Sequence, residues 1–344
     1  MPGCSRREFL KAVGVAGVTA GALPLAAAAI ESITARATRA AGGRPESLVE
    51  LLYASLSAEQ RRVICFAWDH MAGRRGLLRT RVGANWRITD PEIEGDFYSA
   101  DQRALIRAIF EGMTDPEWHA RFDRQLQDDA GGFGRHQSIA IFGTPGESRF
   151  EFVLTGRHMT LRCDGNSAQH VAFGGPIFYG HAAGSWWSGG FFEKSNHPGN
   201  VFWPQAIEAN NLYAMLDGPQ RELALLKRLP QEQAVGFQGA GGSFPGIPVS
   251  ELSADQRGEA QRIVRSLIAP FRQSDRDEVV SALVAQGGLD RCSLAFYQER
   301  DLGGDGLWDC FRLEGPAFVW YFRGAPHVHV WVNVADDPGV ALNA

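Results

Sequence analysis

The sequence lacks most of the short motifs that mark common catalytic or redox sites. No two cysteines are separated by two residues, which argues against a zinc knuckle, an iron–sulfur cluster or a thioredoxin-type dithiol. There is also no Gly-x-Ser-x-Gly turn, no Walker phosphate loop and no His-Glu-x-x-His helix. Cysteine is scarce, with 5 in 344 residues. Four lie beyond the N-terminal region, and we expect buried thiols with at most one disulfide among them: Cys65, Cys163, Cys292 and Cys310.

The chain also lacks long hydrophobic runs after its first 41 residues, so we expect no membrane span in the mature protein. It has no excess of basic residues either: the formal net charge is −5. A basic surface is the usual mark of proteins that bind nucleic acids or anionic membranes. The composition therefore argues against both classes of partner.

What the N-terminus does contain is an arginine pair, Arg6-Arg7, followed by an apolar stretch from Ala12 to Ala29. This pattern predicts a twin-arginine (Tat) signal peptide over residues 1–41, with small-residue cleavage sites at Ala26–Ala28 and between Ala37 and Ala41. We expect the Tat translocase to export the protein folded, to the periplasm or another extracytoplasmic compartment. Because this route often carries proteins that load a cofactor first, it favours a metal or redox centre.

The remaining residues, 42–344, predict a single large α+β domain. Residues 42–135 are mainly helical in pattern, 136–203 hold strands and an aromatic loop, 204–288 are helical again, and 289–344 hold the C-terminal strands. Closely spaced strands pair antiparallel. We therefore expect one antiparallel sheet built from the middle and C-terminal strand clusters, with the N-terminal and central helices packed on it. The strand candidates are 138–142, 150–154, 158–162, 293–298, 308–313, 317–322 and 327–334.

Capping boxes mark several predicted helix starts, in which a serine and a Glu or Gln three residues later satisfy each other's backbone donors. They lie at Ser47–Glu50, Ser57–Gln60, Ser99–Gln102 and Ser253–Gln256. The recurring Ser-Ala-Glu/Asp-Gln-Arg pattern resembles an internal repeat, but independent helix starts explain it without a duplication. Continuous helical patterns cover 204–227 and 254–285.

His327-Val-His329 is the most specific local pattern, because residues i and i+2 of a strand project to the same face and can hold one metal ion. A third ligand is available from His158, which opens a predicted strand, or from His181, which also serves as a candidate fourth ligand. Three neutral imidazoles with one open position suit zinc, copper or iron. The alternative is a pair of histidines that only bond to nearby loops. His136 and His197 are outside candidates for the cleft.

Arg157 and Arg323 precede these histidines and are candidate catalytic residues that orient a substrate carboxylate, phosphate or sugar hydroxyl. The alternative for each is an internal ion pair. A long Gly- and aromatic-rich loop, 174–204, is a candidate binding loop or lid. Within it, the candidate substrate-binding residues are Tyr179, Trp186 and Trp187.

Three segments carry a resemblance to a known family: Thr155-Gly-Arg-His-Met-Thr-Leu-Arg-Cys-Asp164, Gly174-Gly-Pro-Ile-Phe-Tyr-Gly-His181 and Phe322-Arg-Gly-Ala-Pro-His-Val-His329. With Leu56–Asp69 and Leu289–Asn333, they resemble the bacterial family named "domain of unknown function 3500". The resemblance implies an export signal and shared histidines at positions 158, 327 and 329. Many members have Gly-His-His where this chain has Gly156-Arg157-His158, so one potential ligand is absent here. The family name implies no activity.

These observations lead to three functional hypotheses. The first is an exported metalloenzyme with oxidoreductase chemistry, using copper or iron held by histidines beneath the aromatic loop. The second is a zinc-dependent hydrolase or lyase at the same residues. The third is a metal-free periplasmic binding protein, in which the Trp-rich loop and the two arginines hold a small molecule, either a sugar or an organic acid.

Overall fold

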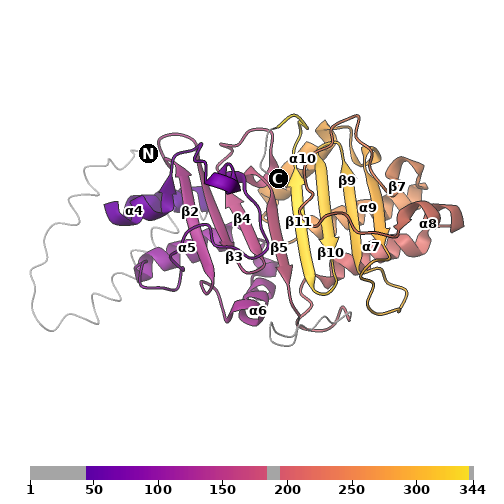
Figure 1. Ribbon diagram of the computed structural model, residues 1–344, viewed down its shortest axis with the longest axis horizontal. Helices are drawn as coiled ribbons and strands as arrows, with labels where there is room; N and C mark the ends of the chain where they lie inside the picture. Colours follow the sequence, from indigo (N-terminus) through magenta and orange to yellow (C-terminus); the bar gives the residue numbers. More distant parts are fainter. Residues whose placement is uncertain (1–43, 184–193, 341–344) are drawn as a thin grey trace, which may run out of the picture. The chain divides into compact units, whose positions relative to one another are not determined.

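The two predicted strand clusters join in one sheet, which confirms the predicted α+β single-domain fold. The computed structural model describes residues 44–183 and 194–340. Within them, eight helices pack on a mostly antiparallel sheet of 11 strands (Figure 1). The predicted signal peptide and its cleavage sites lie outside the described residues. No helix in the described part is long and apolar enough to cross a membrane.

The sheet order is β1-β2-β3-β4-β5-β11-β10-β9-β8-β6, with β7 added beside β8. Only the β1–β2 and β6–β8 pairs are parallel. The N-terminal strands are β1 (Cys65–Phe66), β2 (Gln137–Gly143), β3 (Phe150–Gly156), β4 (Met159–Cys163) and β5 (Ile177–His181). The C-terminal strands are β6 (Leu225–Leu226), β7 (Ile247–Pro248), β8 (Ser293–Tyr297), β9 (Cys310–Gly315), β10 (Phe318–Arg323) and β11 (Val328–Val334).

The order of helices and strands occurs twice along the chain. The strand order counted inward from one edge of the sheet is therefore nearly the same as that counted from the other edge. The first repeat, residues 45–181, runs through two helices, a short edge strand, two more helices and four antiparallel strands. Its helices are α3 (Pro45–Ser55), α4 (Ala58–Ile64), α5 (Ala100–Met113) and α6 (His119–Ala130). The second repeat, residues 203–334, follows the same plan with α7 (Trp203–Met215), α8 (Gly218–Ala224), α9 (Ala254–Ile268) and α10 (Gln273–Ala285). The repeats meet where β5 pairs with β11.

Matching hydrogen bonds hold the capping helices together in both repeats. Gln60 and Gln102 bond to each other through their side chains, and Gln220 and Gln256 do the same. Gln102 also donates to a carbonyl at the end of α3, as Gln256 does at the end of α7. Independent helix starts do not account for these pairs between helices. The interpretation of the recurring motif without a repeat is therefore wrong.

Three of the four predicted capping boxes are present, at the starts of α4, α5 and α9. The prediction at Ser47 is wrong, because α3 already begins at Pro45. The fourth box is at Asp217, where Asp217 and Gln220 open α8. Each of the two continuous helical patterns forms two helices instead of one. In the second pattern, α9 ends at Ile268 because Pro270 cannot continue a helix, and α10 begins at Gln273. The four cysteines in the described part are free thiols; three are buried, as expected, whereas Cys65 is half-buried.

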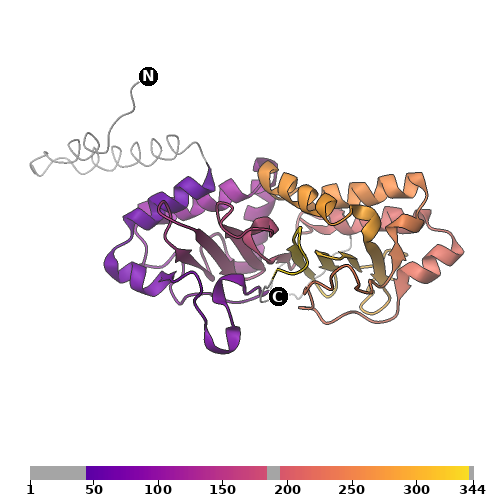
Figure 2. The same ribbon diagram turned by 90° about the horizontal axis from the view of Figure 1, so that it is seen from above.

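Helices cover one face of the sheet and loops cover the other, and we call these the helix face and the loop face. Successive residues of a strand project to opposite faces. Figure 2 shows helices, including α9 and α10, gathered on one side of the sheet. On the other side, Phe178, Tyr321 and Trp331 pack against Val82 and Val235, which belong to connecting loops. This division decides which histidines meet.

Candidate metal centre

His158 occupies the two-residue turn between β3 and β4, one position before the strand that it was predicted to open. Its φ is 54°, and its backbone N–H donates to the Ala84 carbonyl over 2.8 Å. The side chain is completely buried. Its Nδ1 lies 2.9 Å from Asp129 Oδ2, which fixes the direction of the ring. The second ring nitrogen, Nε2, is buried and has no hydrogen-bond partner.

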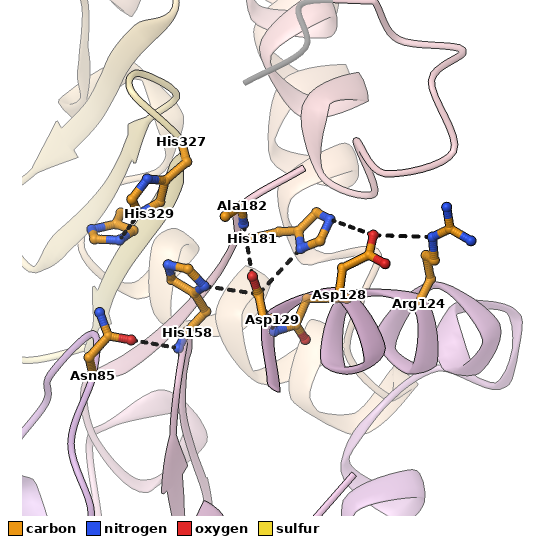
Figure 3. A network of polar contacts seen from close by, with 10 residues as sticks. Asn85, Arg124, Asp128, Asp129, His158, His181, Ala182, His327 and His329 are labelled. Carbon is orange, nitrogen blue, oxygen red and sulfur yellow. Dashed lines mark hydrogen bonds and ion pairs between the residues drawn. The ribbon is translucent and has the colours of Figure 1, made fainter. Parts of the chain in front are cut away.

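His327 and His329 come to the same place from the start of β11. Their Nε2 atoms lie 2.9 Å apart. The ring of His158 lies 5.0 Å from the ring of His327 and 5.1 Å from that of His329, measured between centroids. One nitrogen from each of the three residues lies within 4.8 Å of the others, and Figure 3 shows the rings gathered at the end of the sheet. Among the described residues, these three form a group that could hold a metal ion.

Two carboxylates orient the histidine group from outside. Asp129 accepts from His158, and Glu232 accepts from Nδ1 of His329. A hydrogen bond at Nδ1 leaves Nε2 as the lone-pair nitrogen of a neutral imidazole, which is the form that binds metal ions. The bonds therefore leave Nε2 of His158 without a partner, and leave Nε2 of His329 to accept either the hydrogen bond from His327 or a metal ion.

The electrostatic setting keeps the rings neutral. Burial lowers the pKa of His327 to about 4 and that of His329 to about 3, with the nearby Arg323 charge acting in the same direction. Burial also lowers the pKa of His158. Burial alone would raise the pKa of Glu232, but the hydrogen bond from His329 and the positive charges around the carboxylate together lower it to about 2. Uncharged imidazoles beside ionised acids are suited to metal ligation.

Asp129 was not predicted, although it makes more contacts than any other acid near the histidines. Besides His158, it accepts from His181 over 3.3 Å and from the backbone N–H of Ala182 over 3.1 Å (Figure 3). These hydrogen bonds hold its pKa well below the usual range, even though burial acts the other way. One signal was available in the sequence: Asp128 and Asp129 stand in the last turn of α6, where the helix dipole disfavours negative charge. The sequence around Glu232 contains no comparable pattern that would have predicted its role.

His181 does not join the group of three. In the β5–β11 register it pairs with Val328, while His329 pairs with Gly180, so the side chains of His181 and His329 project to opposite faces of the sheet. Its ring instead lies between two acids, with Nδ1 near Asp129 and Nε2 3.8 Å from Asp128 (Figure 3). We therefore assign His181 to the carboxylate network behind His158 and not to a fourth ligand position.

Both predicted arginines lie beside the histidines. Arg323 pairs with His329 across the β10–β11 ladder, and its Nε lies 3.6 Å from Glu232 Oε1. Arg157 precedes His158 in the turn. It also lines a cavity of about 990 Å³ whose wall includes Asp129, Trp86 and the outside candidate His136.

The predicted aromatic loop divides into different parts. Its first residues form β5, at the centre of the sheet, because Ile177–His181 pairs with both β4 and β11. Tyr179 is buried on the helix face, where its hydroxyl donates to Gln205 and accepts from Trp320. We therefore assign Tyr179 to the core and not to substrate binding. Trp186 and Trp187 lie outside the described residues.

No family model, no curated protein and no solved structure matches this chain. The resemblance to the "domain of unknown function 3500" family and the twin-arginine signal therefore stay predictions.

Proposed function

We propose that the protein is a metalloenzyme in which His158, His327 and His329 bind one transition-metal ion. The observation that carries the proposal is the convergence of three imidazole nitrogens within 4.8 Å of one another, with two of the rings oriented by carboxylates. Nitrogens that ligate one zinc ion at about 2.0–2.1 Å lie roughly 3.4 Å apart in a tetrahedral site. The Nε2 atoms of His327 and His329 lie 2.9 Å apart, at hydrogen-bonding distance, so they would move slightly apart on binding the ion.

The buried Nε2 of His158 supports the same proposal. A buried polar nitrogen without a partner is costly, and a ligand is a common reason for its presence in a folded protein. Ligation by a metal ion would satisfy this atom and would also separate the two close Nε2 atoms of His327 and His329. Asp129 and Glu232 would then act as outer residues that fix the tautomers of His158 and His329.

The donor set narrows the choice of metal. Non-haem iron oxygenases typically use two histidines and one carboxylate, whereas both carboxylates here bond to the far side of the rings. Three neutral imidazoles suit copper, which preserves the predicted oxidoreductase chemistry, and we take this as the first candidate. The second candidate is a zinc-dependent hydrolase or lyase, favoured by the carboxylate–histidine pairs that are frequent at zinc sites.

Metal analysis of natively produced protein tests the proposal. We expect close to one equivalent of copper or zinc in the wild type, and a large loss in His329→Ala or, if that variant does not fold, in His327→Ala. His70→Ala is the matched control, because His70 lies against Phe66, away from the three histidines. Electron paramagnetic resonance then separates copper from zinc. Wild-type protein that folds but binds neither metal would overturn the proposal and favour a metal-free binding protein.

A further inference from the structure

Arg323 is buried without the partners that a buried guanidinium normally has. Its exposed fraction is 4%, and its Nε and Nη2 atoms are buried without hydrogen bonds. The nearest acid is Glu232, but its Oε1 lies 3.6 Å away and accepts from His329. A buried charge with unsatisfied donors is costly, because it has lost its hydration without gaining hydrogen bonds.

Two other buried arginines in the same sheet have hydrogen-bond partners for their guanidinium groups. Arg162 donates to Glu151 and to two backbone carbonyls, and Arg312 forms a two-pronged pair with Glu314. Both lie on the loop face, as Arg323 does. The fold therefore can satisfy a buried arginine, and Arg323 stands apart from this pattern.

The unpaired donors lie at the histidine group. Arg323 and His329 are opposite each other in the β10–β11 ladder, so their side chains share the loop face. Arg157, next to His158, also has a buried Nε without a partner. The two arginines therefore stand beside different histidines of the group, Arg323 beside His329 and Arg157 beside His158.

We infer that this site binds the oxyanion of its substrate, a carboxylate or a phosphate group, through Arg323, with Arg157 beside His158 as a second cation. The inference rests on the proposed metal centre. Three neutral imidazoles add no negative charge, and the two nearby acids already bond to histidines. A divalent ion beside Arg323 therefore leaves a positive centre. The planar guanidinium fork matches both oxyanions.

The test uses full-length protein loaded with cobalt, whose visible spectrum reports ligands that reach the metal, together with calorimetry. The probes are oxalate and inorganic phosphate, titrated separately. We expect at least one probe to bind the wild type, and Arg323→Gln to weaken that binding roughly 10–100-fold, as expected for lost hydrogen bonds to a charged group. Arg323→Lys, which keeps the charge but loses the fork, should fall between them. Arg149→Gln is the control, because Arg149 is 58% exposed and lies over Trp68.

The outcomes separate this inference from the proposed function. Binding of oxalate alone identifies a carboxylate substrate, and binding of phosphate alone identifies a phosphate. A wild type that holds cobalt but binds neither probe overturns the oxyanion inference and leaves the metal centre standing. Equal binding by wild type and Arg323→Gln also overturns it. If Arg323→Gln does not fold, Arg323→Lys and Arg157→Gln replace it in the test. Wild-type affinity for the probe in both of these variants contradicts the inference. A wild type that cannot hold metal contradicts the proposed function itself.

Discussion

The two repeats share their order of elements but not their chemistry. In the first, β3 and β4 are joined by a two-residue turn, Arg157-His158; in the second, β9 and β10 are joined by Pro316-Ala317. These turns stand at equivalent places in the sheet order. Only the first carries a histidine, and the partners of that histidine come from β11 of the second repeat. The site therefore needs one contribution from each repeat, although the scaffold is built twice.

Both repeats also bury an arginine–glutamate pair on the loop face, and breaking these pairs should give the largest effects on stability. Arg312→Met leaves Glu314 with only the neutral donor Gln238, so we expect a loss of about 3–5 kcal/mol. Arg162→Met should cost less, because Arg79 still donates to Glu151 over 3.2 Å. Urea unfolding monitored by circular dichroism measures both. A larger loss for Arg162→Met would show that Arg79 does not compensate.

Each repeat also supplies one carboxylate that orients a proposed ligand, Asp129 from the first and Glu232 from the second. Asp129→Asn should lower metal affinity about 10–100-fold, because an amide cannot accept from His158 and His181 as a carboxylate does. Glu232→Gln should act at the lower end of that range, since its side chain is 34% exposed. Competition with a chelator gives both affinities, with exposed Glu147→Gln as the control. A stronger effect at Glu232 would reverse the proposed ranking.

Much of the fold was predictable because its signals are local. Alternating apolar residues and capping serines fixed most strands and helix starts. The histidine group was only partly predictable, since His-x-His is a local pattern whereas the choice between His158 and His181 depends on the β5–β11 register. A pairing that brings together residues about 150 positions apart leaves no trace in either segment. Asp129 and Glu232 were missed because each meets its histidine through packing within its own repeat, across 29 and 97 positions of sequence.

The two histidines of the second repeat should also make stability depend on pH. In metal-free protein, His327 and His329 have pKa values of about 4 and 3, below the ordinary 6.5, so the unfolded chain binds more protons between these limits. Stability should therefore be full above pH 6.5 and fall as the pH drops towards 4, by at most about 1.4 kcal/mol per pH unit for each histidine. His329→Gln should flatten this dependence in urea unfolding measured from pH 4 to 8. An unchanged slope would contradict the lowered pKa.

Asp309 should act in the opposite direction. Burial, with the charges of Asp301 and Asp305, raises its pKa to about 7 from an ordinary 3.8. The folded protein therefore keeps this proton longer than the unfolded chain, and stability is lost as the pH rises from about 4 to 7. Asp309→Asn should remove that loss, so the variant gains relative to wild type at pH 8 but not at pH 4. A gain of the same size at both values would point to packing instead of ionisation.

The smallest expected effect concerns the feature that the repeats share most closely. Gln102→Ala and Gln256→Ala each remove a side-chain bond to a second glutamine and a bond to a carbonyl at the end of the preceding helix. Because the lost bonds are alike, we expect similar destabilisation, about 1–2 kcal/mol for each variant. Exposed Gln231→Ala is the control. A clear loss of stability at one position and none at the other would show that the two glutamine pairs do not stabilise their repeats equally.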